Sequence, residues 1–396
     1  MTGRRSTLAF VPPRYGTEVV GGSESVMREA AHGLAERGWD VEVLTTCASS
    51  HYTWANDHPP GETRVGPVKV HRFPTVLPVT GDLRHTLEVR MQAGLALTHQ
   101  EELTWLNGVF RVPELFHHLL AHGSRYRAIV LSPYLFWSSV ACAGIAPERT
   151  VMMPCLHDEA YARLEVVRTA LTRAARAWFL SGPEHDLAHR LGLAPAAHDV
   201  VGAGVEVPPA YDPEGFRARH GLGRPFVLYA GRREGGKGWD ELLSAFAEAS
   251  GAIDLDLVTM GVGRVEVPPG LEGRVVDLGF LPDEEAPHAF AAAAAYVQPS
   301  RNESFSRTVM EAWLAGTPVL ANAQSEVVRW HCERSGAGVT WEGRDELIAG
   351  LELVSEASGA AAAIARQGRA YVLEHYTWPA VLDRMEASLE ALPCAG

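Results

Sequence analysis

Residues 225–261 read PFVLYAGRREGGKGWDELLSAFAEASGAIDLDLVTMG. An apolar run over 225–231 is followed by a glycine-rich loop, an amphipathic segment over 239–249 and a second apolar run over 254–261. This spacing predicts a strand, a loop, a helix and a second strand, and such a unit places its two strands parallel in one sheet. The stretch therefore predicts an α/β fold.

The same succession occurs in the first half of the chain. Residues 7–11 predict a buried strand, residues 23–37 a helix that ends before Gly38, and residues 39–46 a second strand. We expect further strands over 128–132, 150–153, 177–181, 275–278, 295–298 and 318–321, and helices beside the sheet over 82–122. A Gly/Pro-rich stretch from Gly202 separates the two series. The chain is thus interpreted as two doubly wound α/β domains.

Composition excludes several classes of function. The chain has 396 residues, 46% of them hydrophobic, and a formal charge of −13, which argues against non-specific binding to nucleic acid or to an anionic membrane. No run of 18 apolar residues occurs, and the first apolar run ends early, at Pro12-Pro13, so we expect neither a membrane segment nor a signal peptide. Five scattered cysteines without a C-x-x-C pair are typical of the cytoplasm, which is the expected location.

The loop 231–238, GRREGGKG, nearly matches the phosphate-binding pattern G-x-x-x-x-G-K-[ST]. It fails at the last position, because Gly238 has no hydroxyl to hold Mg²⁺. Backbone N–H groups, the following helix N-terminus, Arg232 and Lys237 would still attract an anion. Lys237 is one of only two lysines among the 35 basic residues. A plain surface turn and a P-loop-like NTPase or kinase remain open at this point.

A second constellation lies in residues 298–321, QPSRNESFSRTVMEAWLAGTPVLA. A strand ends near Pro299, a loop carries Glu303, a helix begins near Ser306, and Glu311 lies two helical turns beyond Glu303. Both carboxylates could line one groove at the carboxyl end of the sheet. Taken singly, each carboxylate is more simply a helix-end charge or a solvated helix face. Two anion sites with two carboxylates together suit a ligand that carries a diphosphate and hydroxyl groups, such as a nucleotide-sugar.

In this order, Gly21-Gly22, the loop with Arg232 and Lys237, and the E-x₇-E segment from Glu303 to Glu311 resemble family 4 of the retaining glycosyltransferases, of the GT-B type. The resemblance implies two Rossmann-like doubly wound domains that face each other across a cleft. It also implies a C-terminal helix that crosses back to the first domain, which matches the segment from Tyr376. We expect an N-terminal acceptor-side domain over 1–205 with 376–396, and a C-terminal nucleotide-sugar-binding domain over 206–375.

The resemblance implies specific roles in the second domain. Arg232 and Lys237 would neutralise the donor diphosphate, Glu303 would contact the donor sugar and Glu311 would accept from the ribose hydroxyls. The remaining donor-binding candidates would offer backbone groups: Gly261, Gly263, Leu281, Phe305, Ser306 and Arg307. The family usually has glycine where this chain has Ser306, so the contacts to the donor at that position are open.

In the first domain the resemblance implies that Gly21 and Gly22 bind the donor or the acceptor and that His157 contacts the donor sugar. Residues proposed to meet the acceptor are Tyr15, Glu18, Tyr134, Asp158 and Glu159. Several of them are acidic or aromatic, which suits a hydroxyl-rich or cationic amino-polyol acceptor. The pair His185 and His189 has the spacing of a zinc helix but lacks the glutamate of H-E-x-x-H, and is interpreted as a solvated face.

The resemblance hence implies a metal-independent retaining hexosyltransferase that moves a sugar from a UDP- or GDP-sugar to a hydroxyl of a small molecule or glycoside. We expect no cofactor, no metal and no covalent nucleophile. UDP-glucose, UDP-N-acetylglucosamine and GDP-mannose fit equally well, and the oligomeric state is left open. The alternatives are a P-loop-like NTPase or kinase, and a protein that binds a nucleotide-sugar without catalysis.

Overall fold

The computed structural model describes residues 6–19, 21–78, 82–233, 235–356 and 359–393, and the chain in it divides into two units. Unit 1 comprises the residues up to Gly204 together with those from Val381 onward, and unit 2 comprises Val205–Ala380. The divisions expected from the sequence lie after residues 205 and 375. Those of the structure lie after Gly204 and Ala380.

Unit 1 is built on an eight-stranded sheet with the order β3-β4-β2-β1-β5-β6-β7-β8. Its strands are β1 (Thr7–Val11), β2 (Asp40–Thr46), β3 (Gly61–Val65), β4 (Val68–Phe73), β5 (Ala128–Leu131), β6 (Thr150–Met152), β7 (Arg176–Phe179) and β8 (His198–Val200). All neighbouring strands pair parallel except β3, which pairs antiparallel with β4. The central strand β1 is almost wholly buried, as expected for a parallel sheet covered on both faces.

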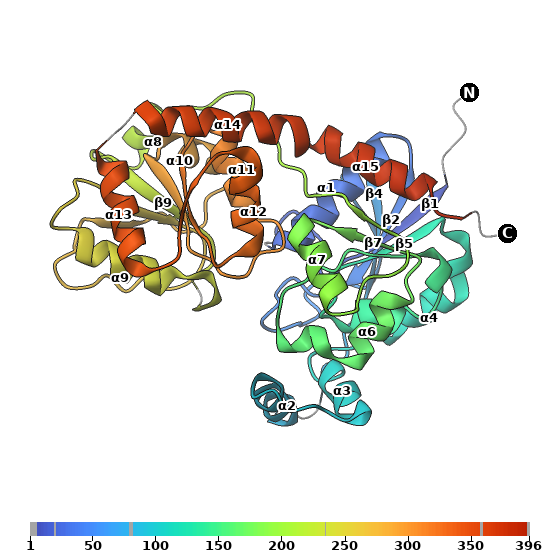
Figure 1. Ribbon diagram of the computed structural model, residues 1–396. Coiled ribbons are helices and arrows are strands. Elements are labelled where there is room, and N and C mark those ends of the chain that lie inside the picture. The colour runs from blue at the N-terminus through green and yellow to red at the C-terminus, as the bar shows by residue number, and fades with distance from the viewer. Residues whose placement is uncertain (1–5, 20, 79–81, 234, 357–358, 394–396) are drawn as a thin grey trace. The chain divides into compact units, whose positions relative to one another are not determined.

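The helices of unit 1 are α1 (Gly22–Glu36), α2 (Asp82–Gln92), α3 (His99–Leu106), α4 (Pro113–His122), α5 (Trp137–Cys142), α6 (Glu165–Thr172) and α7 (Gly182–Arg190). Of these, α2 and α3 pack against each other, and α3 against α6, away from the sheet (Figure 1). Helix α1 buries the apolar positions that predicted it, and the chain leaves it through Gly38 at φ +92°, where a residue with Cβ would be strained. Helices α2 to α4 confirm the helical segment expected over 82–122.

The C-terminal helix α15 (Trp378–Glu390) contributes most of its length to unit 1. Figure 1 shows it, in red, beside α1. Arg37 donates to Asp383 and Glu386 at 2.7 and 2.8 Å, and Trp178 Nε1 donates to Ser388 Oγ at 2.7 Å. The crossing back of this helix, expected from the resemblance, is therefore present in the fold.

Unit 2 carries a six-stranded parallel sheet with the order β11-β10-β9-β12-β13-β14. The strands are β9 (Phe226–Ala230), β10 (Asp256–Met260), β11 (Val275–Asp277), β12 (Ala295–Gln298), β13 (Val319–Asn322) and β14 (Val339–Trp341). The helices are α8 (Pro213–Arg219), α9 (Trp239–Ala249), α10 (Ala286–Ala292), α11 (Arg307–Leu314), α12 (Glu326–Ser335), α13 (Arg344–Ser355) and α14 (Gly359–His375). Helix α9 has the bounds that the sequence predicted.

Two segments depart from their sequence patterns. The alanine run 291–295 is typical of a helix, but α10 ends at Ala292, Ala293 is extended and β12 begins at Ala295. The strand expected over 177–181 is β7, which ends at Phe179, and Ser181 caps α7 by accepting from the N–H of Glu184. A serine ahead of a helix is a typical N-cap, and this preference outweighs the continuing apolar run.

Candidate functional site

The loops after β9 and β12 meet at the carboxyl edge of the sheet in unit 2. Strand β9 pairs with β10 on one side and β12 on the other, so the chain order changes direction between β9 and β12. Ligands of open α/β sheets bind at this kind of switch point. Here Lys237 Nζ donates to Glu303 Oε1 at 2.8 Å, with side chains 31% and 14% exposed. The structure thus joins two residues that the sequence selected from stretches 66 positions apart.

Glycines allow these loops to pack closely. Gly238, which precedes α9, has φ +71°, and a Cβ there would lie 2.5 Å from the carbonyl oxygen of Pro299. A Cβ on Gly261 would lie 2.1 Å from the carbonyl oxygen of Gly231. The serine or threonine of a P-loop cannot occupy position 238 without moving the β12 loop. This close contact explains why the loop has glycine at position 238, where the P-loop pattern has serine or threonine.

The two arginines of the loop differ in their surroundings. Arg232 is exposed, whereas the side chain of Arg233 is 2% exposed and contacts Asp277 at 3.1 Å. Arg233 also donates to Thr259 and to the carbonyl oxygens of Gly261 and Gly263. Arg233 therefore connects the loop after β9 with the loop after β10. The sequence alone did not single out Arg233, because adjacent arginines give no signal as to which one is buried.

The chain enters α11 through Ser306, which has left-handed dihedrals of φ 68° and ψ 72°. Ser306 is 5% exposed, and its Oγ accepts from Gln298 Nε2 at 2.7 Å. Phe305 is buried, with its ring edge-on to His331 and Tyr376. The side chain at position 306 is hence turned onto Gln298 of β12. Gln298 is a residue of this site that the sequence reasoning missed.

Glu311 lies on α11, where Arg307 Nη2 approaches its carboxylate at 4.0 Å. The structure brings Phe305, Ser306, Arg307 and Glu311 together at the start of one helix, as the sequence proposed. On the other side of β9, the Gly261 N–H donates to the Gly279 carbonyl at 2.7 Å, which places the segments of Gly261 and of Leu281 side by side. Leu281 itself is half-buried.

Unit 1 has its own switch point, between β1 and β5. Gly21 precedes α1 in an extended conformation, and a Cβ on it would lie 2.4 Å from Glu24 Oε2. Glu24 is buried and paired with Arg14 at 2.5 Å. Gly21 thus lets the chain pass close to a buried ion pair at the start of α1, whereas a Cβ on Gly22 would have no atom within 4 Å.

His157 follows β6 in a loop anchored from α7. Both carboxylate oxygens of Glu184 accept backbone N–H groups: Oε1 that of Leu156 at 2.6 Å and Oε2 that of Leu180 at 2.5 Å. Glu184 is 1% exposed, and burial raises its pKa to about 8, against the opposing effect of the N–H groups of Leu180, Leu156 and Ser181. The sequence did not identify Glu184, although a glutamate three residues after a capping serine is a known signal.

The acceptor candidates fall into two groups. Tyr15 and Tyr134 are each 1% exposed and belong to the core of unit 1. Glu18 and Asp158 are exposed and paired, with His58 at 3.1 Å and with Arg163 at 2.6 Å, while half-buried Glu159 accepts from Tyr134 Oη at 2.5 Å. The acidic residues are therefore the acceptor candidates with accessible side chains, and Tyr134 positions one of them.

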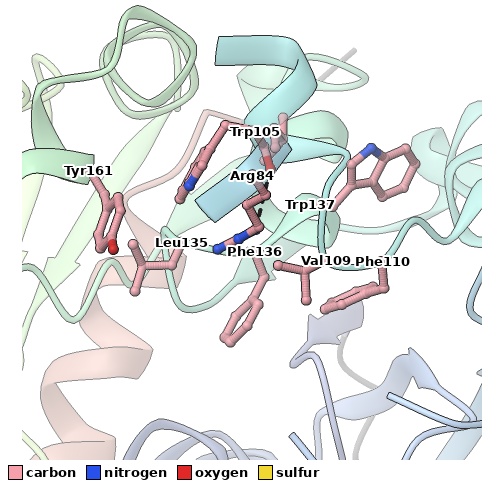
Figure 2. A pocket seen from close by; sticks show the side chains of 9 residues that line it. Arg84, Trp105, Val109, Phe110, Leu135, Phe136, Trp137 and Tyr161 are labelled. Atoms are coloured by element: carbon pink, nitrogen blue, oxygen red, sulfur yellow. Dashed lines mark hydrogen bonds between the residues drawn. The ribbon is translucent and has the colours of Figure 1, made fainter. Parts of the chain in front are cut away.

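A pocket of about 120 Å³ lies beside helices α2 and α3. Figure 2 shows its lining, which is mainly aromatic and aliphatic: Arg84, Trp105, Leu106, Val109, Phe110, Leu135, Phe136, Trp137 and Tyr161. Trp105 stacks on Tyr161 with centroids 5.1 Å apart, and the guanidinium of Arg84 lies 4.8 Å from the Trp105 ring. The pocket is smaller than a typical ligand site and carries a cation, so it suits an apolar group better than a cationic polyol.

Metal ligands do not gather at the loops of unit 2: within its described residues, no three His, Cys, Asp or Glu side chains lie close enough to share an ion. The sequence Asp254-Leu-Asp256 is no exception, because Asp256 starts β10 and accepts from Arg274 at 3.1 Å. One such group occurs in unit 1, formed by histidines. In the described part of the chain, no helix has the length and apolarity needed to cross a membrane.

Comparison with known proteins gives one family match and several similar proteins. Residues 224–356 match the family model described as glycosyl transferases group 1. A 2-deoxystreptamine glucosyltransferase of Streptomyces kanamyceticus is 36% identical over 173 residues, which cover 39% of this chain and 44% of that protein. A 2-deoxystreptamine N-acetyl-D-glucosaminyltransferase of Streptomyces fradiae is 34% identical over 174 residues, with 39% and 41% covered. The matches span less than half the length of these relatives.

Other similarities extend over more of the chain. A D-inositol 3-phosphate glycosyltransferase of Mycobacterium bovis is 28% identical over 347 residues, covering 78% of this chain and 65% of that protein. The solved sucrose-phosphate synthase of Thermosynechococcus elongatus superposes with a TM-score of 0.73 at 19% identity, covering 98% and 99% of the two chains. The Anabaena protein HepE, in complex with UDP and glucose, gives 0.71 at 18% identity, covering 98% and 100%. These structures show that the chain has the GT-B fold.

Proposed function

Because residues 224–356 match the model of the glycosyl transferases group 1 family and the chain has the GT-B fold, we propose that it is a retaining hexosyltransferase. It transfers a sugar from a nucleotide-diphosphate sugar to a hydroxyl of a small acceptor. The names of its relatives, each a transferase or a synthase of a glycoside, support this assignment.

The observation that carries the proposal is the pair of Lys237 and Glu303 at the switch point of unit 2. Negative charge grows on the leaving diphosphate during transfer, and a preorganised cation at that place lowers the barrier. Lys237 supplies a compact ammonium, and Arg232 on the same loop adds a second charge. Glu303 holds Lys237 in position and accepts from a hydroxyl of the donor sugar.

The nucleotide is proposed to lie along the same edge of the sheet. Glu311 accepts from the ribose hydroxyls, and the backbone at Phe305, Ser306 and Arg307 offers donors at the start of α11. The base lies against the segments of Gly261, Gly263 and Leu281, which run side by side. The complex of HepE with UDP and glucose supports a donor of this class.

In unit 1 the resemblance assigns the donor sugar to His157 and a phosphate or acceptor role to Gly21 and Gly22. Glu184 is a positioning residue in this proposal, because it holds the backbone just before His157. The reaction needs no covalent nucleophile: the acceptor attacks from the face that the phosphate leaves, and a phosphate oxygen helps to remove the acceptor's proton.

We further propose a hydroxyl-rich or cationic amino-polyol acceptor. Two relatives are named for 2-deoxystreptamine, which is of this class, and the accessible candidates Glu18, Asp158 and Glu159 are acidic. Carboxylates hydrogen-bond to both ammonium and hydroxyl groups. The mycobacterial relative is named for an inositol phosphate instead, and an anionic acceptor of that kind is the outcome that would contradict this assignment.

Transfer assays with UDP-glucose, UDP-N-acetylglucosamine and GDP-mannose test the function, with an aminocyclitol, inositol 3-phosphate and fructose 6-phosphate as acceptors. We expect product with one donor and the aminocyclitol, and a loss of kcat/KM of about 100-fold in Lys237→Ala. Arg301→Ala removes a nearby exposed pair, with Glu241 at 3.1 Å, and is the matched control. Full activity in Lys237→Ala would refute the site, and binding of a donor without transfer to any acceptor would favour a non-catalytic binder.

EDTA distinguishes the remaining alternative. A P-loop-like NTPase needs Mg²⁺ for nucleotide turnover, whereas the proposed transferase works without a metal. We expect transfer to continue at an undiminished rate in EDTA and no release of phosphate from ATP. Activity abolished by EDTA and restored by Mg²⁺ would instead support the NTPase or kinase.

A further inference from the structure

Three histidines of unit 1 that have no part in the proposed donor site come together. His185 and His189 lie one turn apart on α7, and His198 is the first residue of the edge strand β8. One ring nitrogen from each histidine lies within 4.8 Å of those of the other two. The ring centroids are 4.4 to 5.0 Å apart. The fold thus adds a third imidazole to a pair that the sequence interpreted as a solvated face.

Hydrogen bonds orient two of the three rings. His185 Nδ1 lies 2.8 Å from Asp186 Oδ1, and His198 Nδ1 lies 3.2 Å from the carbonyl oxygen of Pro195. Since both partners accept, each Nδ1 is the protonated nitrogen and Nε2 keeps its lone pair. Histidine ligands of metal ions are typically held by a second bond of this type, to a carboxylate or a backbone carbonyl.

We propose that His185, His189 and His198 form a binding site for a divalent transition-metal ion of the Zn²⁺ class. Imidazole nitrogens suit Zn²⁺, Ni²⁺ and Cu²⁺, and three of them leave a fourth position for water. A tetrahedral zinc ion holds its nitrogen ligands about 3.4 Å apart, from zinc–nitrogen distances of about 2.0–2.1 Å. Metal binding therefore requires the three rings to turn closer together than 4.8 Å, and His189 is the exposed ring of the three.

Such an ion would join the last turns of α7 to the edge strand β8. The first turn of the same helix carries Glu184, which holds the backbone of Leu156 beside His157. Metal binding to the native state but not to the unfolded chain stabilises a protein by mass action. Binding of the ion therefore stabilises unit 1 by joining α7 to β8. This inference does not depend on glycosyl transfer.

Equilibrium dialysis of the metal-free full chain against micromolar Zn²⁺ tests the proposal. We expect one bound ion per chain, a thermal unfolding temperature raised by several degrees, and a visible spectrum typical of tetrahedral Co²⁺ when cobalt is bound instead. His189→Ala and His198→Ala should each weaken binding at least tenfold. His122→Ala is the matched control. His122 is also exposed, and its ring lies beside that of another histidine, His118, with the ring centroids 4.9 Å apart.

Melting curves of the metal-free variants establish that each one folds. The proposal is overturned if the wild-type chain binds no stoichiometric Zn²⁺, or if His189→Ala and His198→Ala bind it as tightly as the wild type. It is equally overturned if His122→Ala, and not the two cluster variants, loses the ion.

Discussion

Ser306 has a backbone conformation that is unfavourable for any residue with a Cβ atom. Its φ of 68° lies in the left-handed region, which costs a residue with Cβ about 1–2 kcal/mol, while its hydrogen bond with Gln298 returns about 1 kcal/mol. Ser306→Gly removes the backbone strain but also loses the hydrogen bond with Gln298. We therefore expect its unfolding free energy to differ from that of the wild type by no more than about 1 kcal/mol. Ser306→Ala keeps the strain, loses the bond and should be destabilised by about 1–3 kcal/mol.

Urea unfolding of both variants measures this difference. The control is Ser300→Ala, which removes another buried hydroxyl of the same loop, one that donates to the Asn302 carbonyl. Equal destabilisation of Ser306→Gly and Ser306→Ala would mean that the backbone conformation contributes nothing. Because glycine usually stands at this position in the family that the chain resembles, donor affinity of Ser306→Gly also reports how far the side chain shapes the sugar pocket.

At the scale of elements, the turn into α9 depends on Gly238. A Cβ there would meet the Pro299 carbonyl oxygen at 2.5 Å, and its φ of +71° adds strain. We expect Gly238→Ala to lower the unfolding free energy of unit 2 by about 3 kcal/mol, as the β12 loop moves away. Gly236→Ala is the control, because no atom lies within 4 Å of a Cβ at that position. Calorimetry that finds both variants equally stable would contradict the close packing of the two loops.

Helix α7 makes unit 1 sensitive to pH through Glu184. Unfolded Glu184 loses its proton near its ordinary pKa of 4.5, whereas burial holds the native pKa at about 8. Between these values unfolding releases a proton, so this carboxyl's contribution to stability is full below pH 4.5, falls as pH rises and is lost above about 8. Glu184→Gln has no such proton.

The measurement is unfolding free energy from pH 5 to 9 for the wild type and Glu184→Gln. We expect the unfolding free energy of the wild type to fall relative to that of Glu184→Gln as the pH rises. Glu165→Gln, which changes an exposed carboxylate on α6, should keep the wild-type slope. A slope unchanged in Glu184→Gln would show that Glu184 is ionised throughout this range.

The elements predicted from sequence were those with an apolar run or an apolar period. Strands β1 and β9 are short apolar runs that are almost entirely buried, and helix α9 buries apolar residues at helical spacing. Strand β3 was missed because its residues GETRV are almost all exposed and carry no such face. Lys237 and Glu303 could be placed at the same edge of the sheet in advance because parallel strands end there, but the ion pair between them was not predicted. His198 could not be joined to His185, because only the position of β8 at the sheet edge relates them.

At the scale of the whole molecule, unit 1 is discontinuous and depends on the end of the chain. Beyond Ala380 the chain buries Val381, Leu382, Met385 and Leu389, and Arg127 donates to the carbonyls of Leu389 and Leu392. The packing is tight, since a Cβ on Gly33 would lie 2.5 Å from Leu382. Unit 2, by contrast, is continuous from Val205 to Ala380.

A chain that ends at Ala380 should therefore lose unit 1 and keep unit 2. Removing several buried apolar side chains costs about 1.5–3 kcal/mol each, which together is comparable to the whole stability of a domain, about 5–15 kcal/mol. We expect calorimetry of the truncated chain to show one unfolding transition instead of two, still raised by UDP or GDP, and no transfer activity. A chain that ends at Pro393 keeps every contact named above and should behave as the full chain does. Two intact transitions after truncation at Ala380 would mean that α15 only covers unit 1, while loss of both would mean that the units fold as one.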